Sequence, residues 1–296
     1  MPARTATLGV IGGSGLYAMD GLSDVEEVRP RTPFGAPSDA ITIGTLDGLS
    51  VAFLPRHGRG HRLTPSEVPS RANIYALKSL GVEWVIAVSA VGSLREDYAP
   101  LDLALPDQLF DRTKARPSSF FEGGVVAHVS FAEPFCPRLG GVLWEAMAGL
   151  GDVRAHRGGT YVCIEGPAFS TKAESRIYRQ LGCDIIGMTA LPEAKLAREA
   201  ELHYAMIACV TDYDVWHESA ETVTVETVVA NLSRNVENAR RIIRVAAGRI
   251  AAGAGAAPST CGCEHALEHA IMTDPSLISA PLRDRYGLLI GKYLAG

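Results

Sequence analysis

The chain has 296 residues, enough for two average domains or for one larger α/β domain. With 47% hydrophobic and 21% charged residues and a mean hydropathy of +0.10, it resembles ordinary globular proteins. This composition excludes disorder, collagen-like repeats and membrane bundles. The net charge is −5 and the pI is about 5.9, so we expect neither nucleic acid nor a membrane as a partner. An anionic ligand would need a local pocket.

The sequence predicts a cytoplasmic protein. No run of apolar residues is long enough to span a membrane, and the N-terminus does not read as a secretory signal. Four of the six cysteines are isolated in the sequence, which is typical of buried thiols in a reducing compartment: Cys136, Cys163, Cys183 and Cys209. Cys261 and Cys263 differ because they form a C-x-C pair.

Short apolar runs alternate with stretches of helical periodicity along the chain. We expect buried strands at 8–11, 40–46, 51–54, 84–88, 161–164, 184–188 and 204–210. We expect helices at 72–80, 137–150, 172–181 and 193–201, several of them ending at a glycine. Such alternation is typical of an α/β fold with a largely parallel or mixed sheet. Ligands of such sheets bind where the carboxyl ends of strands meet loops.

The C-terminal part divides into three predicted segments. A long helix is expected at 223–250, with Arg240, Arg241 and Arg244 on a solvated face. Residues 251–260 form an Ala/Gly-rich connector, and 261–296 are too short for an independent core. We therefore expect one catalytic domain over 1–250 and a helical tail packed on the body or on a neighbouring subunit.

The first predicted strand ends in a glycine-rich turn, GGSG at 12–15. Glycines let backbone N–H groups approach a phosphate, and Ser14 adds a hydroxyl. The turn fits neither the dinucleotide fingerprint nor the P-loop, so by itself it indicates either a phosphate cradle or a tight turn.

Two basic side chains, Arg56 and His57, directly follow the predicted strand 51–54. They suit a cluster of phosphate oxygens, although they could also be solvated loop charges. A metal site formed by His57 and His61 is disfavoured, because Gly58 and Gly60 oppose the helix that such a pair needs.

Hydroxyl and carboxyl side chains follow three further predicted strands. Ser89 comes after 84–88, Thr189 comes near 184–188, and Asp212 and Asp214 follow 204–210. In extended backbone the two aspartates would face the same way, and their repulsion would raise one pKa. Carboxyls so placed suit general acid catalysis or recognition of an amino group, and a structural or capping role is equally compatible.

Together with other motifs, these residues give the chain a resemblance to the trimeric purine nucleoside phosphorylase superfamily, over residues 8 to about 250. The matching segments are GGSG at 12–15, TPFG at 32–35, PSD at 37–39, RHG at 56–58, ANI at 72–74, SAVGSLRE at 89–96, AEPFCP at 132–137, EGP at 165–167, GMT at 187–189 and PE at 192–193. The resemblance implies a single-domain phosphorylase/hydrolase-like fold, a twisted mixed β-sheet flanked by helices.

Within the superfamily the chain is most similar to the branch that acts on 5′-methylthioadenosine. That branch transfers the methylthioribose to phosphate, giving adenine and 5-methylthioribose 1-phosphate in purine and methionine salvage. No cofactor and no metal are implied, because phosphate is a co-substrate. By resemblance, the phosphate-binding residues would be Ser14, Arg56, His57, Ser89 and Thr189.

The resemblance also assigns the purine and sugar contacts. Asp212 would protonate the departing base with Asp214 supporting it, Phe169 would stack on the base, and Met188 and Ala90 would line the sugar. Enzymes for 6-oxopurines carry Asn at the position of Asp212 and Glu at the position of Ser170, and both differences favour adenine. A 6-oxopurine or methylthioinosine phosphorylase is the alternative, and a non-catalytic nucleotide-binding protein is a remote one.

The 5′ end of the sugar would meet His128, Val225 and Val228. In the superfamily the residue corresponding to His128 comes from the adjacent subunit, so the resemblance implies a homotrimer or a dimer of trimers. Two departures affect the pocket: Ser70 replaces a family aromatic residue and Ala168 replaces a common arginine.

The C-x-C pair in the tail resembles that of some bacterial and archaeal members, in which it can form disulfides. Cys261 and Cys263 are therefore interpreted as free thiols, as a redox-sensitive disulfide, or as Zn²⁺ ligands together with His265 and His269.

Overall fold

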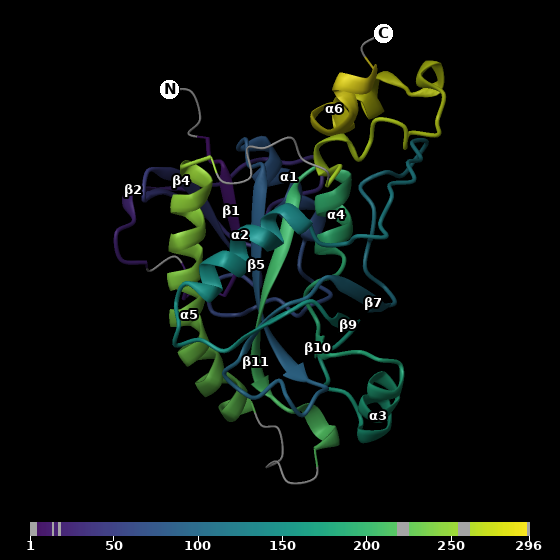
Figure 1. Cartoon of the computed structure of the whole chain (residues 1–296). Coiled ribbons are helices and arrows are strands. Elements are labelled where there is room, and N and C mark those ends of the chain that lie inside the picture. Colours follow the sequence, from purple (N-terminus) through teal and green to yellow (C-terminus); the bar gives the residue numbers. More distant parts are fainter. Residues whose placement is uncertain (1–4, 14, 17–18, 218–224, 254–260, 295–296) are drawn as a thin grey trace.

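The computed structural model describes residues 5–13, 15–16, 19–217, 225–253 and 261–294. Eleven strands form one mixed sheet flanked by helices, as the sequence predicts (Figure 1). The strands are β1 (Leu8–Gly12), β2 (Ser23–Val28), β3 (Ile41–Leu46), β4 (Leu49–Pro55), β5 (Trp84–Ser93), β6 (Leu103–Leu105), β7 (Gln108–Arg112), β8 (Ala155–Arg157), β9 (Thr160–Ile164), β10 (Ile185–Gly187) and β11 (His203–Asp212).

Six α-helices and three short 3-10 turns cover this sheet in the described residues. The α-helices are α1 (Ser70–Ser79), α2 (Pro137–Ala148), α3 (Lys172–Gln180), α4 (Glu193–Glu199), α5 (Val225–Ala251) and α6 (Ala280–Leu294). The 3-10 turns are η1 (Asp214–Trp216), η2 (Cys263–His265) and η3 (Pro275–Leu277). None of the described helices combines the length and the apolar character that crossing a membrane requires.

The sheet branches at its central strand β5. Along the main path the order is β2-β3-β4-β1-β5-β10-β9-β7, while β11 pairs with β5 over almost its whole length and with β6. β1, β4, β5 and β11 run parallel, whereas β10 runs antiparallel to β5. The end of β10 therefore points back toward the middle of β5.

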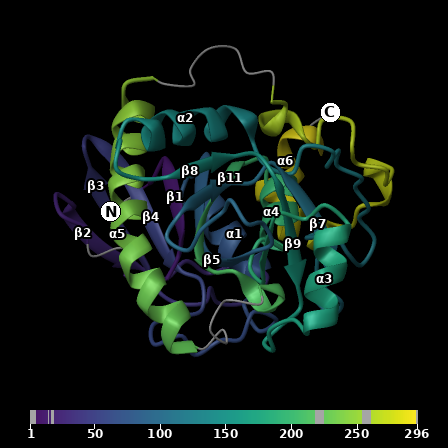
Figure 2. The ribbon, with the colours of Figure 1, turned by 60° about the horizontal axis from the view of Figure 1, so that its bottom comes forward.

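Alternating side chains of the central strands build a core on each face of the sheet. Ile11 and Leu54 pack on the face with α1 and α4, and Val10 and Phe53 pack on the face with α2 and α5. Figures 1 and 2 show α5 running along one side of the molecule and α6 at the opposite corner. Because both faces of these strands are covered, they appear as continuous apolar runs in the sequence.

Four strands were not predicted from the sequence. β2 was missed because five of its six residues are exposed and its pairing with β3 leaves no apolar pattern. β6 and β8 have only three residues each, and most of β7 is exposed.

The three arginines of α5 lie on a partly solvated face, where Arg241 pairs with Asp152 and Arg244 with Asp47.

The tail after residue 260 packs on the body of the same chain. Tyr286, Leu289 and Ile290 of α6 are buried in the core on the α1 and α4 face. The Tyr286 hydroxyl donates a hydrogen bond to the carbonyl of Glu122, 3.1 Å away. A short antiparallel bridge joins Ala127 to Ile271, so the tail supports the loop that precedes α2.

Candidate active site

The candidate site lies along the second half of β5. β1 and β4 end at Gly12 and Pro55, beside Ala87 and Val88, but β5 continues to Ser93. Ser89 and Ala90 therefore lie inside a strand, which corrects the expectation that they follow one. The physical reason is β11, which stays hydrogen-bonded to β5 along this stretch and keeps it extended.

At one end of this stretch two hydroxyl groups meet across the sheet. The Thr189 hydroxyl donates to the Ser89 hydroxyl at 2.7 Å, and the Thr189 backbone N–H donates to the Tyr161 hydroxyl at 3.3 Å. Tyr161 is fully buried beneath Gly187, and burial raises the pKa of its phenol to about 12. The antiparallel β10 thus brings together the two hydroxyls that the sequence suggested for phosphate.

His57 reaches the same region from the turn after β4. Its Nδ1 lies 2.8 Å from the carbonyl of Leu63, which fixes Nδ1 as the donor and leaves Nε2 as an acceptor in the neutral ring. Burial and the nearby Arg56 lower the pKa of His57 to about 4, so the ring is neutral near pH 7. The rings of His57 and His61 stack face to face at 4.3 Å, and Gly58 and Gly60 between them have left-handed backbone, so the two histidines do not lie on a helix.

Arg56 is buried and its charge is matched by a carboxylate. Its Nε and Nη2 donate to Glu193 at 2.8 and 3.0 Å, and both side chains are only 4% exposed. Nη1 donates to the carbonyl of Val88 and Nη2 to that of Ile11. Arg56 therefore ties β4, β5 and β1 to α4, and it gives the site less net positive charge than the sequence suggested.

A second buried arginine, Arg116, was not predicted from the sequence. Its Nη1 donates to the carbonyls of Met188 and Leu191, each at 2.6 Å, and its Nη2 donates to those of Ile164 and Glu165. The side chain is 3% exposed. Its Nε donates to the Ser66 hydroxyl at 3.3 Å and lies 3.7 Å from the carboxylate of Glu165. One guanidinium thus fixes the loop that carries Thr189, and no sequence signal marks it because most of its partners are backbone carbonyls.

Two cavities adjoin these groups. The smaller, of about 10 Å³, is lined by residues that include Arg56, His57, Arg116 and Thr189. The larger, of about 180 Å³, shares Arg116 and Ser70 with the smaller one. The smaller cavity holds about one water, so a phosphate there would require side chains to move.

At the far end of the stretch, Asp212 sits beside β5. Its Oδ2 accepts from the Thr211 hydroxyl at 2.7 Å and its Oδ1 from the Asp214 backbone N–H at 2.8 Å. A Cβ on Gly92 would lie 3.1 Å from Oδ1, so any larger residue there would crowd the carboxylate. Burial raises the pKa of Asp212, opposed by the hydrogen bonds from Thr211 and Asp214.

Asp214 supports Asp212 through the backbone. The chain turns at Asp214, whose φ of 52° lies in the left-handed region, so the two carboxylates do not share an extended strand face. Its carboxylate accepts from the Ser170 hydroxyl at 3.1 and 3.2 Å. Burial is the largest cause that raises the pKa of both aspartates. The expected repulsion by Asp214 also raises the pKa of Asp212, but it is a smaller cause.

The remaining predicted contacts lie between or beside these ends. Ala90 is a half-buried residue of β5, and Met188 packs on Gly166 directly after β10. Phe169 is 49% exposed at the start of the loop that carries Ser170. Its ring is therefore accessible to a planar ligand.

Three predicted residues cannot be placed. Ser14 and the side chains of Val225 and Val228 lie outside the described residues, although both valines belong to α5. His128 is exposed, and its backbone N–H donates to the carbonyl of Ala270 in the tail. It lies on the surface of its own chain.

The tail cysteines do not gather with His265 and His269. Cys261 and Cys263 instead meet Cys136 and His203, and His265 and His269 are exposed. Cys136 was expected to be an isolated buried thiol. None of the six cysteines is in a disulfide.

Comparison with known proteins agrees with this geometry. The family model described as "Phosphorylase superfamily" matches residues 7–247. The chain is 57% identical over 293 residues to the S-methyl-5′-thioadenosine phosphorylase of Gloeobacter violaceus, covering 98% of this chain and 97% of the relative. It is 59% identical to the protein of the same name from Chloroflexus aurantiacus, covering 98% and 99%.

Two solved structures are similar throughout. One is a methylthioadenosine phosphorylase from an antarctic soil metagenomic library, with a TM-score of 0.91 and 50% identity over 97% of this chain and 99% of that one. The other is a variant of the adenosine/methylthioadenosine phosphorylase of Schistosoma mansoni in complex with methylthioadenosine. Its TM-score is 0.79, with 37% identity over 84% of this chain and 92% of that one.

Proposed function

Because this chain belongs to the phosphorylase superfamily, we propose that it catalyses phosphorolysis of 5′-methylthioadenosine to adenine and 5-methylthioribose 1-phosphate. The observation that carries the proposal is the half-buried Asp212 with a raised pKa, held next to Gly92 near the end of β5, away from the hydroxyl pair. The names of relatives at 57% and 59% identity support the same substrate.

The spacing along β5 suits a nucleoside with phosphate at one end. Ser89 and Gly92 are three residues apart, which is about 10 Å at the rise of a strand. The hydroxyls of Ser89 and Thr189 and the ring of His57 would bind phosphate at the first position. Asp212 would meet the purine at the second, with Ala90 and Met188 beside the sugar between them.

These residues carry hydrogen-bonding groups and charges that can bind phosphate. The Ser89 and Thr189 hydroxyls can each donate to a phosphate oxygen, and Ser14 would add another from the turn after β1. The neutral His57 can accept from a protonated phosphate oxygen through Nε2. Arg56 and Arg116 supply positive charge nearby, although Glu193 offsets that of Arg56.

In the reaction, a phosphate oxygen forms a bond to C1′ as the bond from C1′ to purine N9 breaks. Positive charge develops on the sugar, and the adjacent phosphate dianion stabilises it. Adenine leaves with the electron pair and accepts a proton at N7. Asp212 is placed to donate that proton, because its raised pKa favours the protonated form.

Recognition of the base would use the same end of the site. Asp212 accepts hydrogen bonds from the 6-amino group when it is ionised, and Asp214 orients it through its backbone N–H. Ser170 is held by Asp214, and the accessible ring of Phe169 would stack on adenine.

The complete pocket would be shared between subunits of a homotrimer. His128 is exposed and supported by the tail, a position that suits reaching into a neighbour's site near Val225 and Val228. Size-exclusion chromatography with light scattering would distinguish a trimer from a dimer of trimers.

The proposed compartment is the cytoplasm. The six cysteines form no disulfide, which is compatible with a reducing environment.

The test is to measure adenine release from methylthioadenosine by the full-length chain, with and without phosphate. We expect release only with phosphate, and faster than hypoxanthine release from inosine. Equal release without phosphate would replace the proposal by a nucleosidase. Asp212→Asn should shift the ratio of the two activities toward inosine by about 10–100-fold; an unchanged ratio would remove the assigned role of Asp212.

A further inference from the structure

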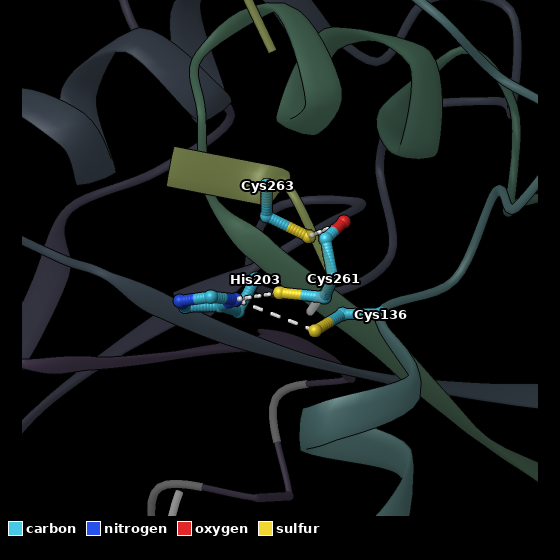
Figure 3. Close-up of side chains that lie close together, drawn as sticks. All are labelled: Cys136, His203, Cys261 and Cys263. Carbon is cyan, nitrogen blue, oxygen red and sulfur yellow. Dashed lines mark hydrogen bonds between the residues drawn. The ribbon is translucent and has the colours of Figure 1, made fainter. Parts of the chain in front are cut away.

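Four side chains of metal-binding types meet at the start of β11, at the opposite end of that strand from Asp212. Figure 3 shows Cys136, His203, Cys261 and Cys263 pointing toward one another. We call them the Cys3His cluster. Cys136 caps the N-terminus of α2, His203 is the first residue of β11, and the two tail cysteines flank the start of η2. Three segments far apart in sequence therefore contribute to one point.

The distances within the cluster match a tetrahedral site. All four ligand atoms lie within 4.8 Å of one another, and His203 Nδ1 is 3.3 Å from the sulfur of Cys136 and 3.5 Å from that of Cys261. Zinc–sulfur bonds of about 2.3 Å and zinc–nitrogen bonds of about 2.0 Å put neighbouring ligands roughly 3.5–3.8 Å apart. Small shifts would therefore let one ion touch all four atoms.

The surroundings orient His203 as a ligand. Its Nε2 lies 2.8 Å from Oε1 of Glu264, and Nη1 of Arg138 holds the same oxygen at 3.0 Å. The imidazole also stacks on Trp84 at 4.3 Å. When Nε2–H donates to the carboxylate, the lone pair of Nδ1 faces the sulfurs. A carboxylate is a usual hydrogen-bond partner for the second ring nitrogen of a zinc-bound histidine.

Burial favours a metal over solvated thiols. Cys136 and His203 are each 2% exposed and Cys263 is 1% exposed, while Cys261 is half-buried and leaves an entry path. Three cysteines and one histidine that converge at such depth form a common type of closed structural zinc site.

We propose that the Cys3His cluster binds one Zn²⁺ per chain and thereby fastens the C-terminal tail to α2 and β11. Binding displaces the thiol protons to solvent, so that three thiolates and a neutral imidazole hold the ion. The site is structural, because all four coordination positions come from protein and none remains for substrate. It neither requires nor alters the proposed phosphorolysis chemistry.

The first test is elemental analysis of the full-length protein, purified without chelators and freed of any affinity tag. We expect about one zinc per chain. Cys261→Ser and His203→Asn should reduce zinc to background. Cys209→Ala should keep it, because Cys209 is a buried cysteine on the same strand as His203 but outside the cluster.

Cobalt provides a second readout that does not depend on folding of the variants. Co²⁺ added to the metal-free wild-type chain should give thiolate-to-cobalt charge-transfer absorption and the visible bands of tetrahedral coordination. Glu264→Gln keeps all four ligands and should weaken zinc affinity about 10–100-fold in competition with a chromogenic chelator.

Three experimental results would refute the proposed zinc site. A wild-type protein that is purified without zinc and gives no thiolate absorption with Co²⁺ refutes the site. Thiol counting under non-reducing conditions that finds Cys261 and Cys263 oxidised in the metal-free protein would identify a disulfide instead. Zinc retained undiminished in Cys261→Ser and His203→Asn would place the metal elsewhere.

Discussion

The ion pair between Arg56 and Glu193 offers the sharpest test of how the site is held together. Both side chains are 4% exposed, and Glu193 accepts from Arg56 Nε, from Arg56 Nη2 and from the Tyr204 hydroxyl. Glu193→Gln keeps the shape of the side chain but removes its charge. It leaves the guanidinium buried without a counter-ion and replaces one accepting oxygen by a donor.

The expected loss of folding stability follows from the buried, unpaired charge of Arg56. Breaking a buried pair by removing one partner costs about 3–5 kcal/mol, because the remaining charge stays uncompensated. Since domains are typically stable by about 5–15 kcal/mol, the variant should lose a large fraction of its free energy of unfolding. The assay is equilibrium urea unfolding followed by tryptophan fluorescence, at one fixed chain concentration because the protein is proposed to be oligomeric.

A control that also has two hydrogen bonds between an arginine and a carboxylate exists on the surface. Arg241 donates to both carboxylate oxygens of Asp152 at 2.9 and 3.0 Å, but the two side chains are 37% and 62% exposed. Asp152→Asn should leave the unfolding midpoint unchanged, since water screens and replaces the pair. If Glu193→Gln cost no more than this control, the buried pair would not stabilise the site and our account of Arg56 would be wrong.

Three further predictions concern catalysis. Gly187→Ala would place a Cβ 2.1 Å from the Tyr161 hydroxyl. It should lower kcat/KM about 100-fold, because it would displace the residues proposed to bind phosphate. The control Gly140→Ala adds its Cβ in open space and should leave kcat/KM unchanged. Since a general acid acts protonated, kcat/KM should fall as pH rises through the raised pKa of Asp212, and a limb that persists in Asp212→Asn would contradict this. Arg116→Lys should lower kcat/KM about 10-fold or more, because an ammonium group cannot hold four carbonyls as the planar guanidinium does. A wild-type kcat/KM in this variant would disprove the positioning role of Arg116.

The sequence predicted the elements that follow a burial pattern. β1, β4, β9 and β11 appear as apolar runs because both of their faces are covered, and α1 to α5 appear as periodic stretches. β2 has no such pattern because it lies at the edge of the sheet.

The site was predictable where chemistry-bearing residues lie at or just after the end of a strand, as Asp212, His57 and Thr189 do. Arg116 does not belong to this class, because most of its partners are backbone carbonyls, which every sequence has. The meeting of Cys136 with the tail cysteines could not be found either, because sequence order carries no information about which distant segments pack together.

The length of β5 beyond its neighbours has a consequence for how such a protein can change over evolution. The proposed phosphate end at Ser89 and the proposed purine end at Gly92, beside Asp212, share one strand, yet the Ser89 hydroxyl and the Asp212 carboxylate have different hydrogen-bond partners. Substitutions at sites about 10 Å apart without common partners usually have additive effects. Selection could therefore alter the preferred base near Asp212 step by step while the phosphate end stays intact, so one scaffold can give rise to a series of nucleoside specificities.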